Sequence, residues 1–220
     1  MLKLYGYVIS NYYNMVEHAL LTKGVAFDRE KVLPGGDAAY LDKSPLGKIP
    51  SIETEHGFLS ETSVILDYIE AHYPQPPLAP ADRWGQFKMK ELMKITELYI
   101  ELQARRLLPA LMGGIQLDQA TLDDVATIMG KGYGALARLG QFTPYLMGEQ
   151  VTMADIVLRY SLVVPKLCAS LVKIDAHAIV PGLAAWETRM DGLEVSRSID
   201  ARMKEEMPKF MAQRAQQGGA

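Results

Sequence analysis

The chain has 220 residues, of which 49% are hydrophobic and 22% charged, the composition of an ordinary soluble globular protein. Its 23 basic and 26 acidic side chains give a formal net charge of -3, which argues against a nucleic-acid-binding surface. No apolar run approaches the ~18 residues of a membrane span, and the N-terminal segment lacks the apolar core of a signal peptide, so we expect a cytoplasmic protein. A single cysteine, Cys168, excludes an intramolecular disulfide, and its apolar neighbours indicate a buried side chain.

The first part of the chain alternates strand-like and helical patterns, which predicts a small α/β domain over residues 1–73. Short apolar and aromatic runs indicate strands, and apolar residues at helical spacing indicate helices. The expected elements are a strand, a helix, a strand, a turn, a hairpin and a helix, at Leu2–Tyr7, Tyr12–Lys23, Val25–Leu33, Pro34–Gly36, Pro50–Leu59 and Glu61–His72.

Four prolines between Tyr73 and Pro80 predict a stiff, extended linker at residues 74–82. Residues 83–220 show helical patterns almost throughout, which predicts an all-helical second domain. Its expected helices are a long one closed by two glycines, one loosened by three glycines, and two shorter ones: Arg83–Met112, Thr121–Leu139, Thr152–Leu171 and Gly182–Met190. The polar, glycine-rich tail from Gln213 is expected to fray.

Two stretches carry a family resemblance. The first is SPLGKIPSI from Ser44, which continues after the hairpin as LSETSVILDYI from Leu59. The second is GEQVTMADI from Gly148, in which Thr152 and Asp155 have the spacing of a capping box at a helix start. Both are similar to motifs of the cytosolic glutathione transferases of bacterial type. The resemblance implies a thioredoxin-like N-terminal domain that binds glutathione, a C-terminal helical bundle and a homodimer.

The resemblance also assigns glutathione-binding residues. Pro50 corresponds to the family's cis-proline, which exposes the backbone of the preceding Ile49 to the cysteinyl part of glutathione. Glu61 is expected to pair with the γ-glutamyl ammonium, and Thr62 keeps the hydroxyl of the family's serine. Lys48 suits the glycyl carboxylate as a point charge. The physics agrees, because a helix start offers free N–H groups and a partial positive charge to a carboxylate.

Catalysis requires the glutathione thiol to ionise. Lowering its pKa by ~2 units takes ~2.7 kcal/mol, which one hydroxyl donor at a helix start supplies. Ser10 falls where serine-type members of the family carry this donor, although an N-cap role is its plain alternative. The sequence around Ser10 departs from the usual family pattern at three positions, so other donors stay open. These rivals are Tyr7, Tyr12, Tyr13 and Asn11.

The electrophile pocket is expected between the domains, with Tyr99, Gln103 and Arg106 on the long helix as candidates; a solvated or dimer-facing stripe is the alternative. The four histidines show no metal-ligand spacing, so no metal is expected. We predict a transferase that conjugates glutathione to a small hydrophobic electrophile. The rivals are a non-catalytic assembly or regulatory module, and a glutathione-dependent dehalogenase or isomerase. The Ser-Ser-Cys run of maleylacetoacetate isomerases is absent, and no cysteine lies in the first eighty residues to support thiol exchange.

Overall fold

A computed structural model describes residues 2–33 and 38–217, with side chains described to residue 213. The turn predicted at Pro34–Gly36 and the last three residues of the tail lie outside these ranges. Contacts divide the chain into two units, one formed by Met1–Pro77 with Asp191–Ala220 and the other by Leu78–Met190. The first break falls inside the predicted linker.

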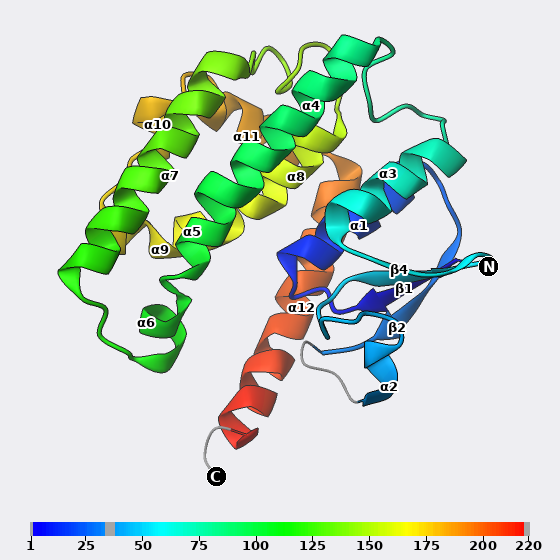
Figure 1. The fold of residues 1–220 in the computed structure, drawn as a ribbon, viewed down its shortest axis with the longest axis horizontal. Helices are drawn as coiled ribbons and strands as arrows, with labels where there is room; N and C mark the ends of the chain where they lie inside the picture. Colours follow the sequence, from blue (N-terminus) through cyan, green and yellow to red (C-terminus); the bar gives the residue numbers. More distant parts are fainter. Residues whose placement is uncertain (1, 34–37, 218–220) are drawn as a thin grey trace. The chain divides into compact units, whose positions relative to one another are not determined.

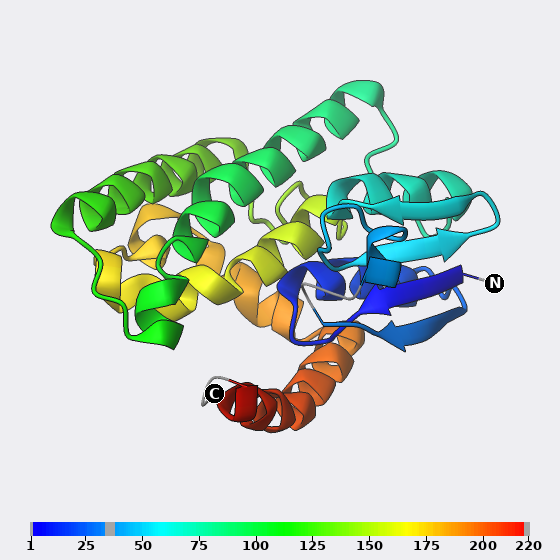
Figure 2. The same cartoon turned by 60° about the horizontal axis from the view of Figure 1, so that its bottom comes forward.

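The first unit is built on a four-stranded mixed sheet with the order β2-β1-β3-β4. The central strand β1 pairs in parallel with β2 and antiparallel with β3, and β3 forms the predicted hairpin with β4. Helices α1 and α3 lie on one face of this sheet and the short α2 on the other (Figure 1 and Figure 2). The bounds in chain order are β1 Leu2–Gly6, α1 Asn11–Thr22, β2 Phe27–Lys31, α2 Ala38–Leu41, β3 Ser51–Thr54, β4 Gly57–Ser60 and α3 Thr62–His72.

Helix α12, Glu194–Gln217, also belongs to the first unit. Its Arg202 donates through Nη1 to Glu17 Oε1 of α1 at 2.7 Å, and Arg29 of β2 donates to the same oxygen at 2.6 Å. Glu17 is fully buried, so this carboxylate between two guanidinium groups ties three elements together. The predicted helical domain extended to Ala220, whereas contacts group this helix with the sheet. The predicted fraying from Gln213 is corrected as well, because α12 continues to Gln217.

The second unit is helical, as predicted. None of the helices in the described ranges combines the length and apolarity needed to cross a membrane. The bounds are α4 Arg83–Ile95, the π-helix η1 Thr96–Glu101, α5 Leu102–Arg105, α6 Leu108–Gly113, α7 Gln119–Leu139, α8 Met153–Ser161, α9 Val163–Val172, α10 Ala176–Ile179 and α11 Leu183–Asp191.

The long helix predicted over Arg83–Met112 is not continuous. It changes to π geometry at Thr96–Glu101 and ends at Arg105. A new helix begins at Leu108, with Pro109 in its first turn. Proline has no amide hydrogen, and its ring clashes with the carbonyl of the preceding helical turn. It is therefore tolerated in the first turn of a helix but not in the helix interior.

The helix predicted over Thr152–Leu171 is broken in the same way. It stops at Ser161 and restarts at Val163, which leaves Pro165 in the first turn of α9. Cys168 on α9 is buried, as predicted. Gly132 on α7 also differs from the expectation, because it does not loosen the helix: a side chain there would meet Ile100 at 2.8 Å, so glycine permits close packing against η1.

The predicted capping box forms at the start of α8. Asp155 is fully buried, and its Oδ2 accepts the amide of Thr152 at 2.8 Å and the Thr152 hydroxyl at 2.8 Å. Its Oδ1 accepts the amide of Leu146 at 2.7 Å and Nε1 of Trp186 at 2.8 Å. Four donors therefore satisfy one buried carboxylate, which fixes the start of α8 to the loop before it and to α11.

Candidate active site

The register of the sheet gathers the predicted binding segments at one end. Tyr5 of β1 lies opposite Ser51 of β3, and Ser51 lies opposite Ser60 of β4. The loop after β1, the segment before β3 and the start of α3 therefore share one end of the sheet. This places six predicted site residues there: Ser10, Lys48, Ile49, Pro50, Glu61 and Thr62.

Two hydroxyl groups hold the segment before β3. The Ile49–Pro50 bond is cis, as predicted. The hydroxyl of Ser44 donates to the carbonyl of Lys48 at 2.7 Å, and that of Tyr40 donates to it at 3.1 Å. The Lys48 side chain is exposed and has no ion-pair partner in the described ranges, so its charge is available to a ligand carboxylate. Sequence reasoning missed both positioning residues, although Ser44 stands where the family motif has asparagine.

Helix α3 begins without a side-chain cap. Its N-cap residue, Glu61, has φ 71° and ψ 113°, and its exposed side chain does not bond to the first turn. A non-glycine residue at positive φ costs about 1–3 kcal/mol, and such strain is concentrated at ligand sites. The next residue, Thr62, is buried. The amide of Val64 bonds to the Glu61 carbonyl at 3.0 Å, which leaves the amides of Thr62 and Ser63 for a bound anion.

Ser10 is the N-cap of α1. Its side-chain oxygen accepts the amide of Tyr13 at 3.3 Å, which is the plain capping role. A hydroxyl that accepts still has its own hydrogen to donate, so capping and donation to a thiolate are compatible. The buried Asn14, which replaces the family's common arginine, donates its amide to the carbonyl of Val8 at 2.9 Å. This bond holds the first loop, residues 7–10, against α1.

Two of the tyrosine rivals are buried. Tyr7 is buried and donates its hydroxyl to Oε2 of Glu206 at 2.8 Å. Burial, reinforced by this hydrogen bond, raises the pKa of Tyr7. Burial together with the charge of Glu17 raises the pKa of Tyr13. The hydroxyl of Tyr7 is therefore engaged by α12, and the donor role of Tyr13 stays a prediction. The remaining rivals, Asn11 and Tyr12, lie in the first turn of α1.

Comparison with known proteins decides the family. A profile of the glutathione S-transferase N-terminal domain matches residues 4–77. A glutathione S-transferase of Pseudomonas putida is 42% identical over 212 residues, which cover 96% of each chain. The chain belongs to the glutathione S-transferase family. A maleylpyruvate isomerase of a Ralstonia species is 28% identical over 71% of this chain and 79% of its own.

A solved structure agrees on the fold of this family member. The holo structure of a maleyl pyruvate isomerase, a bacterial glutathione S-transferase of zeta class, matches with a TM-score of 0.70 and 24% identity. The match covers 90% of this chain and 95% of that one. Family members use glutathione as a substrate. In the described residues, no group of three or more His, Cys, Asp and Glu side chains is arranged to hold a metal ion.

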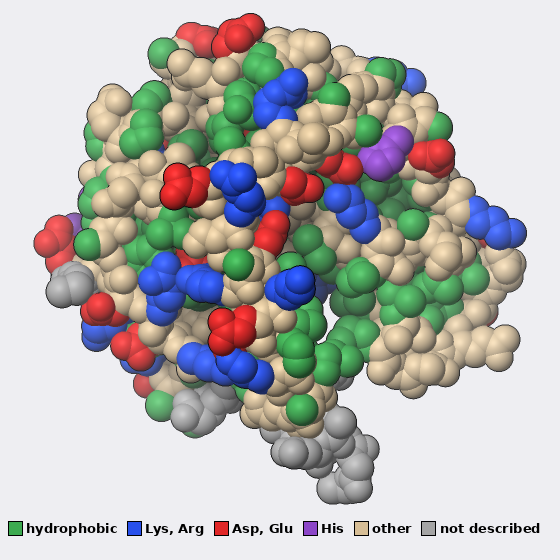
Figure 3. Space-filling model, turned by 180° about the vertical axis from the view of Figure 1, so that it is seen from behind, with side chains coloured by type: hydrophobic (Ala, Val, Ile, Leu, Met, Phe, Trp, Pro, Cys, Tyr) green, Lys and Arg blue, Asp and Glu red, His purple; other side chains and the backbone are tan. Residues whose placement is uncertain are grey.

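A cavity of about 410 Å³ opens beside the first loop, within the sheet-containing unit. Tyr7, Val8 and Tyr13 contribute much of its wall. The basic side chains around it are paired with carboxylates: Arg29 and Arg202 pair with Glu17, and Lys31 donates to Glu206 at 3.4 Å. On the face in Figure 3, basic and acidic side chains likewise lie beside one another. The charged residues that line the cavity are Arg29, Lys31, Arg202, Glu205 and Glu206.

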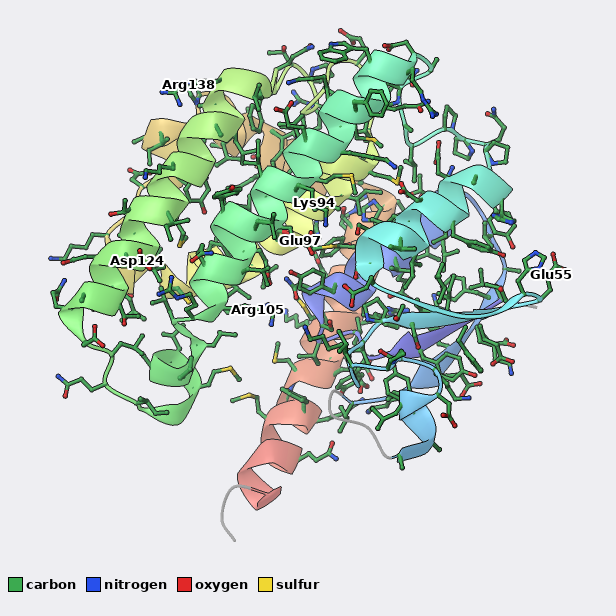
Figure 4. All side chains as sticks on the ribbon, in the orientation of Figure 1. Glu55, Lys94, Glu97, Arg105, Asp124 and Arg138 are labelled. Atoms are coloured by element: carbon green, nitrogen blue, oxygen red, sulfur yellow. The ribbon has the colours of Figure 1, made fainter. Side chains whose placement is uncertain are left out.

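The candidates for the electrophile pocket on the long helix lie in the helical unit. Arg106 Nη1 donates to Gln103 at 2.9 Å and to Asp124 at 2.7 Å, and Figure 4 shows Asp124 on α7. Tyr99 is exposed, and its Cβ and carbonyl lie close to Gly132 of α7. These contacts favour the alternative of a solvated stripe, and a role of the three residues in binding the electrophile stays a prediction.

Proposed function

We propose that the protein is a glutathione transferase in which Ser10 stabilises the glutathione thiolate for attack on a small, uncharged, hydrophobic electrophile. The observation that carries this proposal is the position of Ser10 at the N-terminus of α1 with a hydroxyl hydrogen free of the capping bond. The hydroxyl contributes ~1.5–3 kcal/mol toward a charged acceptor, and the helix terminus ~0.3–2 kcal/mol. Together they are sufficient to keep a bound thiol ionised near neutral pH.

The same end of the sheet supplies the remaining recognition. The ammonium of Lys48 attracts the glycyl carboxylate, and the backbone of Ile49 pairs with the cysteinyl part of glutathione. Glu61 takes the γ-glutamyl ammonium, while the Thr62 hydroxyl and the start of α3 take its carboxylate. This division leaves the sulfur near Ser10, because the two ends of the tripeptide are held by other groups.

The cavity beside the first loop suits the electrophile. It adjoins the residues that precede Ser10, and Tyr7, Val8 and Tyr13 supply apolar surface. Its three cationic residues are already engaged by protein carboxylates, since Arg29 and Arg202 share Glu17 and Lys31 donates to Glu206, so an uncharged molecule is favoured over a dianion.

A titration and an activity panel test the proposal. Glutathione should bind in a calorimetric titration, and the bound complex should show thiolate absorbance in the ultraviolet near neutral pH. Neutral electrophiles should be turned over with loss of the thiol. Binding without turnover of any electrophile would favour the non-catalytic module. Size-exclusion chromatography with light scattering checks the expected homodimer.

A glutathione-dependent isomerase is the second candidate, because a relative is named maleylpyruvate isomerase. The distinguishing measurement is the fate of glutathione: isomerisation regenerates the thiol, whereas conjugation consumes it. Turnover of maleylpyruvate without consumption of glutathione would establish the second candidate. The residues Asn11 and Tyr12 after Ser10 depart from the Ser-Ser-Cys run of the maleylacetoacetate isomerases, so conjugation is the preferred proposal.

A further inference from the structure

A second cavity, of about 300 Å³, lies inside the helical unit. It is lined by residues of α7, α9, α10 and α11, including the exposed Lys166, Asp175 and His177. This volume is at the lower end of the range for small-molecule sites and matches a molecule with a single ring. Most of its wall is apolar, formed by Met129, Leu162, Pro165, Ala169, Val172 and Ile174.

One hydroxyl of the cavity wall makes no hydrogen bond within the described residues. Tyr133 of α7 is only 2% exposed and lines the cavity. Its hydroxyl has no hydrogen-bond partner among the residues that the structure describes. A hydroxyl that donates to no protein atom keeps its hydrogen for another acceptor. The hydroxyl is therefore suited to a ligand atom that accepts a hydrogen bond.

The other polar side chains at the cavity are already paired. Glu187 accepts from Lys166 at 3.1 Å and bonds to Nε2 of His177 at 2.9 Å. Asp175 accepts the amide of Ala178 at 3.1 Å as the N-cap of α10. Because the charges are matched within the protein, a charged ligand would have to displace an existing partner. An uncharged ligand would need only the Tyr133 hydroxyl.

We propose that this cavity is a second ligand site, which takes a small, uncharged, single-ring molecule bearing one hydrogen-bond acceptor. The ring replaces empty space against the apolar wall, and the acceptor satisfies Tyr133. The site lies in the helical unit, whereas the glutathione-binding residues lie in the sheet-containing unit. Occupancy is therefore expected without glutathione.

Acetophenone is a suitable probe, because it has one aromatic ring and one carbonyl acceptor. Its binding is measured by ligand-observed nuclear magnetic resonance and calorimetry, with benzoate and benzylamine as charged analogues of similar size. We expect saturable binding of acetophenone in the absence of glutathione and much weaker binding of both analogues. Absence of saturable binding, or tighter binding of a charged analogue, would overturn the proposal.

Tyr133→Phe is the decisive variant, because it removes only the hydroxyl. Loss of one hydrogen bond should weaken acetophenone binding ~5–10-fold. Its melting temperature should stay close to that of the wild type, because the hydroxyl bonds to no other residue in the described ranges. A lower melting temperature would show that the hydroxyl has a structural partner, and unchanged affinity would show that it does not bind the ligand. Either result would overturn the proposal.

Two further variants sharpen the test. Tyr145→Phe removes a half-buried phenol elsewhere in the same unit and should leave acetophenone affinity unchanged. Ala169→Phe fills the cavity and should abolish acetophenone binding while glutathione affinity stays the same. Retained acetophenone binding in a folded Ala169→Phe protein would place the ligand outside this cavity.

Discussion

The first turn of α8 is capped by a side chain of the protein, whereas the first turn of α3 has no side-chain cap. At α8 the buried Asp155 accepts four hydrogen bonds, from an adjacent loop, from the helix start and from α11. At α3 the N-cap residue is Glu61, which is exposed and has φ 71°. Its side chain bonds to none of the helix amides.

The difference separates stability from recognition. A helix start whose donors are satisfied internally has nothing left for a ligand, and its loss destabilises the fold. A helix start that carries backbone strain and free donors weakens the apo protein but is ready for an anion. Substitutions at the two starts should therefore have opposite consequences.

The largest effect is expected for Asp155→Ala. It leaves the amides of Leu146 and Thr152 and the indole of Trp186 without an acceptor, so the free energy of unfolding should fall by ~3–5 kcal/mol. Urea unfolding measures this change, and calorimetry should show unchanged glutathione affinity. Asp175→Ala is the matched control, since that N-cap has a single amide bond and should cost only ~0.5–2 kcal/mol. A selective loss of glutathione affinity would contradict the comparison.

Ser10→Ala tests whether the Ser10 hydroxyl stabilises the thiolate of bound glutathione. The bound thiol should gain ~1–2 pKa units, so kcat/KM near neutral pH should fall ~10–100-fold. Glutathione affinity should change little, because other residues hold the ends of the tripeptide. The measurement is the pH profile of kcat/KM together with thiolate absorbance. Tyr7→Phe and Tyr12→Phe are run in parallel, and a shifted profile in either would assign the donor role to that tyrosine.

Glu61→Gly addresses the α3 start directly. Glycine adopts φ 71° without strain, so the free energy of unfolding should stay the same or rise by up to ~1 kcal/mol. Glutathione affinity should fall ~10-fold through loss of the carboxylate partner of the ligand ammonium. Glu61→Gln, which retains size and backbone preference, separates the two effects. A variant that loses stability would show that Glu61 has a structural role after all.

The smallest effect is expected for Glu206→Gln on α12. Hydrogen bonds from Lys209 and Tyr7 lower the pKa of Glu206 to about 2. A carboxylate with a lowered folded-state pKa contributes stability above its usual pKa and loses it as the pH falls through the folded value. The variant should therefore be slightly less stable than the wild type near neutral pH, and the difference should shrink between about pH 4.5 and pH 2. Urea midpoints across this range provide the test, with Glu205→Gln as the control. A difference independent of pH would refute the assignment.

Local patterns were sufficient for much of the fold and for the glutathione end of the site. Local sequence signals, namely turn formers, helical spacing and caps, predict several elements. These are the hairpin, α1, α3, α7 and the capping box at Thr152 and Asp155. The helix breaks before Pro109 and Pro165 were missed, although the relevant prolines are visible, because apolar spacing continues across both breaks.

By itself the sequence determined the family and the sheet-and-helix order of the first domain, and it predicted the residues that would recognise glutathione, because each depends on short motifs with a local physical cause. Only the tertiary structure decided the rest. Arg202 meets Glu17 across 185 residues, and Glu206 engages Tyr7 across 199, so neither the grouping of α12 with the sheet nor the occupied hydroxyl of Tyr7 has a local signal. The position of the Tyr133 hydroxyl is of the same kind, because the cavity that Tyr133 lines is formed by four separate helices. Such facts follow from packing at long sequence separation, which no periodicity encodes.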